Sequence, residues 1–138
     1  MFLRALGRAM LTVPRALDAD LLREQRMSAS EYAALMHLSE APGRRLRMSD
    51  LAGASNLSLS GMTRIVDRLQ GQGFVRRERH CGDARGWNAV LTEAGLQRLR
   101  QAWPTHLASV RRHVFDHLND VDVPAFTTAV QRFAAAAE

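Results

Sequence analysis

The fold is decided by residues 48–92, whose sequence is MSDLAGASNLSLSGMTRIVDRLQGQGFVRRERHCGDARGWNAVLT. Ser49 and Ser58 each precede a run of helix-forming residues, where a serine hydroxyl can cap the free backbone N–H groups of a helix start. Gly71 and Gly73 follow as stop signals for the second of these helices. The stretch therefore predicts a short helix, a turn and a second helix.

The second helix is predicted to be amphipathic, because apolar residues recur at the spacing of one helical face. The face expected to join the core carries Leu59, Met62, Ile65, Val66 and Leu69. The opposite face carries small and hydrogen-bonding side chains, namely Ser60, Gly61, Thr63, Arg64, Asp67 and Arg68. A helix with such an exposed face suits the major groove of DNA.

After Gly73 the sequence changes to a β-like pattern. Residues 74–79 predict a strand, residues 81–86 contain a turn, and residues 87–91 predict the return strand. We interpret this hairpin as a wing beside the helix-turn-helix. An arginine at its tip could enter a minor groove, where the negative potential favours a guanidinium group.

The central third of the chain resembles the MarR family of bacterial transcription regulators. The motifs that carry the resemblance are LA at 51–52, TRIVDRL at 63–69, GFVRR at 73–77, DAR at 83–85 and LTEAG at 91–95. In layout the likeness extends over the whole chain. It implies a homodimeric winged-helix repressor or activator, with first, fifth and sixth helices that form the dimer. It also implies an effector pocket between the dimer and DNA lobes, and an Asp83 that holds Arg85 in position.

Two further helices are predicted before this stretch. Apolar residues from Phe2 to Leu21 fall three or four apart, so they predict an amphipathic helix that Pro14 could bend. Ser28 and Glu31 form a capping box for a second helix, which we expect to end near Glu40. The stripe of the first helix has little to bury on its own, which indicates an interface.

Two more helices are predicted after it. Thr92 is predicted to cap a helix, and beyond it helical spacing continues from Leu96 to Leu118 over about six turns, with Pro104 as a kink. Residues 119–122 then end this helix and cap a last one, with an apolar face of Val123, Phe126, Val130 and Phe133. We therefore expect a mainly α fold with a small β-wing. In this single domain, residues 1–138, segments 1–27 and 96–138 would form the dimerisation lobe and 28–95 the winged helix-turn-helix DNA-binding lobe.

The charge of the chain is concentrated in the predicted DNA lobe. All 19 basic residues are arginines, and the formal net charge is +5. Residues 44–85 hold nine arginines against four acids, whereas the rest of the chain holds ten of each. Such clustering is typical of a phosphate-binding surface, although a solvated basic face would give the same count.

The sequence lacks the motifs of an enzyme. It has no Gly-x-Ser-x-Gly, no phosphate-binding loop with lysine, and no lysine for a Schiff base. Cys81 is the single cysteine, so no intrachain disulfide is possible; it could be a redox sensor or an incidental exposed residue. Arginines interrupt the apolar residues of the start, and no run reaches the roughly 18 apolar residues of a membrane span. We expect a cytoplasmic protein without a cofactor.

Histidines and aromatic residues supply two weaker hypotheses. His113 and His117 are four apart, so on one helix they could share a zinc ion, while His106 is nearly two turns away. We favour the alternative that they are half-buried at an interface. A pocket for a small aromatic or phenolic effector is predicted between the second and fifth helices, and plain core packing would explain the same residues equally well. Its residues would be Tyr32, Met36, His37, Trp103 and His106.

The sequence thus predicts a regulator that binds double-stranded DNA with sequence specificity. Arg64, at the centre of the exposed helix face, is expected to read a base, and strand alternation prevents Arg76, Arg77 and Arg79 from all reaching DNA. The residues expected at the DNA are Ser58, Ser60, Gly61, Thr63, Arg64, Arg68, Arg77, Arg79, Asp83 and Arg85. The alternatives are a metal-sensing regulator and a winged-helix module that binds proteins instead of DNA.

Overall fold

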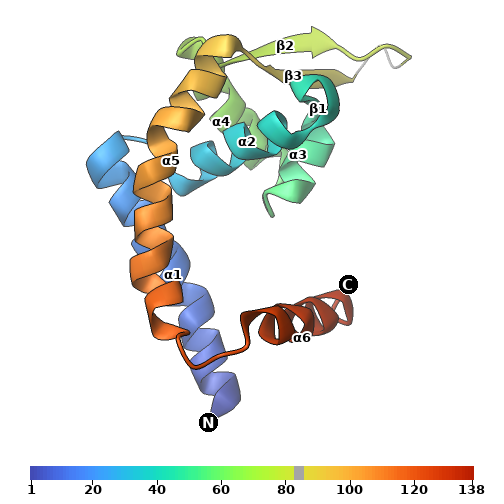
Figure 1. The fold of residues 1–138 in the computed structure, drawn as a ribbon. Coiled ribbons are helices and arrows are strands. Elements are labelled where there is room, and N and C mark those ends of the chain that lie inside the picture. Colours follow the sequence, from blue (N-terminus) through green and yellow to red (C-terminus); the bar gives the residue numbers. More distant parts are fainter. Residues whose placement is uncertain (83–85) are drawn as a thin grey trace.

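The chain folds into a helical stalk that carries a lobe with a sheet at one end (Figure 1). This computed structural model describes residues 1–82 and 86–138. The stalk consists of α1 (Phe2–Gln25) and α5 (Glu93–His113), which run side by side. The wing lobe consists of α2 (Ala29–Glu40), the 3-10 turn η1 (Pro42–Arg44), β1 (Arg45–Arg47), α3 (Met48–Ala54), α4 (Leu59–Gly71), β2 (Val75–Arg79) and β3 (Trp87–Leu91).

The stalk is held together by polar contacts between residues far apart in the sequence. Gln25 Nε2 donates to Thr105 Oγ1 at 2.9 Å, and Ser109 Oγ donates to Asp20 Oδ2 at 2.6 Å. The same carboxylate, which is 5% exposed, pairs with Arg112 at 2.6 Å and with His113 at 3.0 Å. Asp20 therefore fixes the last turn of α5 against α1.

The core of the wing lobe lies where α2, α3 and α4 meet the sheet. Leu35, Leu38, Leu51, Val66 and Leu69 are fully buried there. Ser28 caps α2 in the predicted capping box, and the hydroxyl of Ser58 accepts from Gly61 N at 3.1 Å. The predicted helix starts at these two positions are confirmed, as are those at Thr92 and Asp122.

The predicted wing hairpin is also confirmed, and a third strand joins it. The sheet is antiparallel with the order β1-β3-β2, in which Val75 pairs with Leu91 and Arg79 pairs with Trp87. The extra strand β1 lies on the other edge of β3, with Leu46 opposite Ala89. Because the chain leaves β1 directly into α3, that helix begins at Met48 with Arg47 at the cap position. The prediction that Ser49 caps α3 is wrong.

The predicted length of the last stalk helix is also wrong. α5 runs unbroken through Pro104 but ends at His113, where Val114 leaves the helical region with φ −129° and ψ −69°. A 3-10 turn, η2 (Phe115–His117), follows. The apolar spacing up to Leu118 did not reveal this end, because a 3-10 turn repeats with nearly the same period as an α-helix.

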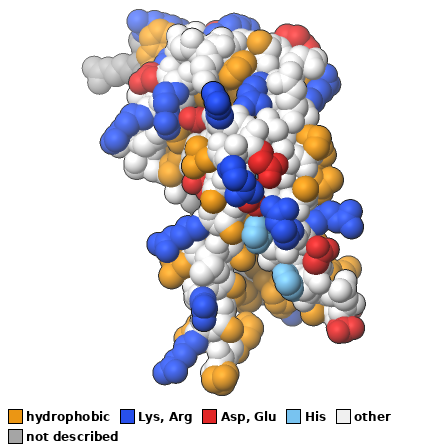
Figure 2. Space-filling model, turned by 90° about the vertical axis from the view of Figure 1, so that its left-hand side faces the viewer, with side chains coloured by type: hydrophobic (Ala, Val, Ile, Leu, Met, Phe, Trp, Pro, Cys, Tyr) orange, Lys and Arg blue, Asp and Glu red, His pale blue; other side chains and the backbone are white. Residues whose placement is uncertain are grey.

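The helix α6 (Val123–Ala135) stands away from the stalk (Figure 1). Its Phe126 and Phe133 are 41% and 43% exposed, and Phe2 and Met10 at the start of α1 are more exposed still. Hydrophobic side chains are accordingly visible at the free end of the stalk in Figure 2, between arginines. Within the described residues, no helix combines the length and hydropathy needed to cross a bilayer.

Candidate nucleic-acid interface

Helix α4 presents an apolar side to the core and a polar side to solvent. Met62, Ile65, Val66 and Leu69 are buried, as predicted. Ser58, Ser60, Arg64, Asp67 and Arg68 are exposed. The prediction that Leu59 joins the core is wrong, since its side chain borders an open groove and is 54% exposed. The polar side of α4 is therefore free to meet a partner.

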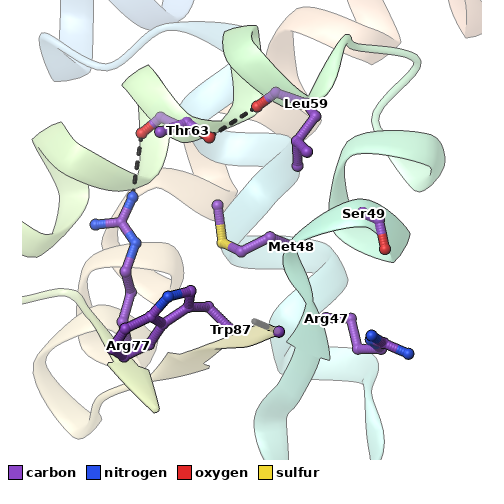
Figure 3. Close-up of a pocket in the computed structure, with 8 residues that line it drawn as sticks. Arg47, Met48, Ser49, Leu59, Thr63, Arg77 and Trp87 are labelled. Carbon is purple, nitrogen blue, oxygen red and sulfur yellow. Dashed lines mark hydrogen bonds between the residues drawn. The ribbon is translucent and has the colours of Figure 1, made fainter. Parts of the chain in front are cut away.

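The groove beside α4 has a volume of about 340 Å³ and separates it from α3 and the wing, β2 with β3 (Figure 3). Leu59 and Thr63 of α4 form one wall, and Met48 and Ser49 at the start of α3 lie opposite. Arg77 and Trp87 enter from the wing. The groove thus combines an apolar lining with polar groups at its edges.

Arg77 connects the wing to α4. Its guanidinium group donates to Gln70 Oε1 at 2.5 Å and to the Thr63 carbonyl oxygen at 3.4 Å, and it pairs with Asp67 Oδ1 at 2.8 Å. The Arg77 side chain is only 20% exposed. These contacts fix the wing relative to α4, so Arg77 holds the two elements together whether or not it also meets DNA.

The other arginines of the predicted site differ in their surroundings. Arg68 lies 3.4 Å from Glu31 of α2, and the guanidinium of Arg79 lies over the Trp87 ring, 4.9 Å from its centroid. Arg64 is exposed and has no ion pair with any residue that the structure describes. Asp83 and Arg85, expected at the wing tip, lie outside the described residues.

Several basic side chains around the wing are already paired with acids of the chain. Arg44 contacts Glu93 at 3.2 Å, Arg45 contacts Glu78 at 3.2 Å, and Arg76 also pairs with Glu78. Each exposed pair of this kind contributes little to stability. Each nevertheless lowers the positive potential of the surface, so the formal excess of charge overstates what a phosphate would meet.

A second cavity, of about 210 Å³, lies between α1, α2 and α5. Tyr32 and His106 line it with their rings stacked at 4.4 Å between centroids, and neither the Tyr32 hydroxyl nor His106 Nδ1 has a hydrogen-bond partner among the described residues. Burial raises the pKa of Tyr32 to about 12 and lowers the pKa of His106. Both side chains are therefore neutral at pH 7.

Only some of the predicted pocket residues line this cavity. Met36 lines it together with Tyr32 and His106. Trp103 is half exposed and packs against His106 from outside the lining, at 6.4 Å between centroids. His37 has intermediate exposure and is not in the lining. The sequence did not identify the α1 residues Pro14, Leu17 and Leu21, which form the remaining wall.

The two histidines proposed for a metal have separate partners. His113 Nε2 contacts Asp20 Oδ2, whereas His117 Nε2 contacts the Arg112 carbonyl oxygen at 3.1 Å. Because α5 ends at His113, the two residues do not share a helix, and the predicted i, i+4 geometry is wrong. Residues 1–82 and 86–138 contain no group of three or more potential metal ligands.

Sequence reasoning missed Met48 and Trp87, which line the groove opposite α4. It also missed Gln70 of α4, which accepts a hydrogen bond from Arg77. The alternation of side chains along β2 places Arg77 on one face of the strand, and this could be read from the sequence. Which residues of α4 it contacts depends on how the wing packs against that helix.

Comparison with known proteins identifies transcriptional regulators as relatives of this chain. Residues 27–86 match the MarR family. The chain is 32% identical over 100 residues to the HTH-type transcriptional repressor YetL of Bacillus subtilis (strain 168), a match that covers 72% of this chain and 59% of YetL. It is 30% identical over 84 residues to the transcriptional repressor MprA of Escherichia coli (strain K12), covering 61% and 48%. The chain thus spans about half of these two relatives.

Two solved structures from Streptomyces coelicolor are similar over nearly the whole chain. Sco3205, a MarR family transcriptional regulator in complex with DNA, superposes with a TM-score of 0.87 and 35% identity, covering 97% of this chain and 83% of Sco3205. AbsC, another MarR family transcriptional regulator, superposes with a TM-score of 0.85 and 37% identity, covering 96% and 89%. The similarity therefore includes the stalk as well as the wing lobe.

Proposed function

Because this chain belongs to the MarR family of transcriptional regulators, we propose that it is a sequence-specific DNA-binding repressor that acts as a homodimer. One observation carries the proposal: α4 has a polar face whose Arg64 has no ion pair among residues 1–82 and 86–138, and Arg77 fixes the wing beside that face. The similarity to Sco3205, which was solved with DNA, supports DNA as the partner. YetL and MprA are repressors, which supports repression and not activation.

The mechanism follows from this arrangement. A polar helix with exposed Ser60 and Arg64 can enter a major groove, where guanidinium groups form paired hydrogen bonds with guanine. Ser58 at the start of α4 and Arg79 of the wing are exposed, and side chains of these types commonly contact phosphates. Two copies would place their α4 helices in successive major grooves, about 34 to 36 Å apart. Repression then results from occupancy of a promoter, with no chemical step, in the cytoplasm where the promoter lies.

The experiment is a selection from a random-sequence duplex pool followed by shift assays across a salt series. We expect a near-palindromic sequence to be enriched, and its affinity to fall with salt as phosphate contacts release counterions. A winged-helix module that binds only proteins would give no tight, sequence-dependent complex. That outcome would overturn the proposal.

We further propose that the cavity beside Tyr32 takes a small aromatic effector with a hydroxyl group. The observation that favours this is a pair of buried polar atoms in an otherwise apolar cavity, Tyr32 Oη and His106 Nδ1, neither of which has a hydrogen-bond partner in the part of the chain that the structure describes. Leaving such atoms unpaired costs free energy, which a phenolic hydroxyl could recover by bonding to one of them. Occupation of a cavity between the stalk and α2 could alter how the two α4 helices are held.

Thermal unfolding with phenol as the probe tests the effector proposal. Phenol should raise the melting temperature of the wild type in proportion to its concentration, because it binds the folded state. Tyr32→Phe removes one hydroxyl from the cavity and should reduce that shift without loss of stability. An equal shift in both proteins would contradict the assigned role of Tyr32.

A further inference from the structure

Leu59 is an exposed apolar side chain at the start of α4, the helix that the proposed function places in a major groove. It occupies the first turn, next to Ser58 and Ser60, and is 54% exposed. A single exposed leucine is ordinary on a protein surface. Leu59, however, lies on the wall of the groove, with Met48 opposite and the 41% exposed Trp87 at the side (Figure 3).

The groove lies between α4 and the wing, the two elements that the proposed function directs towards DNA (Figure 3). Its lining combines apolar side chains with Arg47 and with Arg77, which is already paired with Asp67. An apolar group within a negatively charged surface suits this lining. In the major groove of duplex DNA, the C5-methyl group of thymine is the apolar group that the base edges display.

We propose that Leu59 is a specificity-determining residue, which selects thymine through contact with its C5-methyl group at one position of each half-site. The inference rests on the proposed function, because it requires α4 to lie in a major groove. Leu59 precedes Arg64 by five residues, a rise of about 7.5 Å along the helix. They also point about 140° apart around the helix, at about 100° per residue. The two side chains therefore contact different base pairs, and Leu59 selects a thymine in addition to the base that Arg64 reads.

Replacement of thymine by deoxyuridine tests this directly, because it removes the methyl group and leaves every hydrogen-bonding atom of the base in place. Each thymine of the selected operator is replaced in turn, and the affinity is measured by fluorescence anisotropy. We expect one position per half-site at which the wild type loses affinity about fourfold, the effect of taking one methyl group out of an apolar contact.

The Leu59→Ala variant, tested on both operators, shows whether the loss of affinity depends on the leucine. It should bind the thymine operator about fourfold or more weakly than the wild type, and it should bind the deoxyuridine operator no more weakly than the thymine one. Leu59→Met keeps an apolar side chain of similar size and should retain the sensitivity to the methyl group. Because Leu59 is exposed, these variants should unfold at the wild-type temperature, which a melting curve checks.

The outcomes separate the inference from the function on which it rests. If the wild type forms no sequence-dependent complex, the proposed function fails. If it does, but no single deoxyuridine weakens binding, the thymine contact is overturned and DNA binding stands. The inference is also overturned if Leu59→Ala weakens binding equally on all sequences, because Leu59 would then contact sugar and not a base.

Discussion

Single arginines of the wing lobe differ in whether an acid of the chain already neutralises them. Arg68 and Arg77 pair with Glu31 and Asp67, while Arg64 has no ion pair among the residues described. The count of charges was predictable from the sequence. The pairing of Arg68 was not, because Glu31 is 37 positions from Arg68 and meets it only after α2 packs on α4.

Arg64→Ala is expected to weaken operator binding by about 1 to 3 kcal/mol and to flatten the preference at one base position. The reason is that its exposed guanidinium group is the one on α4 best placed to bond with a base. Binding to single-base operator variants measures the effect. Arg100→Ala, an exposed arginine on α5, serves as the control and should leave the preference intact. Equal loss on every sequence would refute base reading by Arg64.

Asp20 is the residue whose charge matters most to the stalk. Hydrogen bonds from Ser109 and Arg23, then from Arg112 and His113, outweigh its burial and hold the pKa of the Asp20 carboxyl well below its usual range. A depressed folded-state pKa contributes stability above the unfolded pKa of about 3.9, and this contribution is lost as the pH falls towards the folded value.

Asp20→Asn should therefore lower the free energy of unfolding by about 1 to 3 kcal/mol at pH 7, since it leaves the buried Ser109 hydroxyl and the exposed Arg23 and Arg112 without their anion. The difference from wild type should shrink as the pH falls below about 4. Urea unfolding at one fixed protein concentration measures it. A difference that is absent, or that does not change at low pH, would disprove the role of this carboxylate.

Among the helices and strands, features set by nearby residues were predictable from the sequence, whereas features set by contacts between distant segments were not. The caps at Ser28, Ser58 and Thr92 are set by side chains within three residues of the helix start, so the sequence was sufficient for them. The strand β1 forms only because β3 offers a free edge, and it shifts the start of α3. The end of α5 at His113 likewise coincides with contacts to Asp20 on another helix.

The joint between the wing and α5 depends on Gly95. A Cβ atom there would lie 2.1 Å from the Phe74 carbonyl oxygen, so Gly95→Ala should destabilise the fold by about 1 to 3 kcal/mol or more. Gly53→Ala is the matched control: nothing lies within 4 Å of its added Cβ, and it should stabilise α3 by about 0.5 to 1 kcal/mol. Chemical denaturation measures the stability of both variants. A Gly95→Ala protein as stable as wild type would contradict the close approach of Gly95 to the Phe74 carbonyl oxygen.

The whole molecule leaves apolar surface exposed at the ends of the chain. The start of α1 and the face of α6 that carries Phe126 and Phe133 are not covered by the rest of the described chain. The sequence predicted both stripes from their periodicity. It could not establish that α6 stands away from the stalk, because that depends on the path of the chain after η2 (Figure 1). Patches of this kind mark association sites, which is why we propose the homodimer.

Phe133→Asp should convert a dimer, with twice the chain mass of 15.4 kDa, into a monomer, because it places a charge in the apolar contact. Operator binding should fall with it, since one α4 would then act alone. Light scattering after size exclusion gives the mass. Gln131→Asp, a polar exposed position on the same helix, is the control and should remain dimeric. A Phe133→Asp protein that is still dimeric would exclude this face of α6 from the interface.

The central claim is that the α4 helices of two copies bind successive major grooves on the same side of one DNA duplex. The most direct test is to insert about five base pairs, half a helical turn, between the half-sites of the selected operator and to measure the affinity again. The account predicts that binding falls to the level of unrelated DNA, because the second half-site then faces away from its helix. Unchanged affinity for the lengthened operator would contradict it.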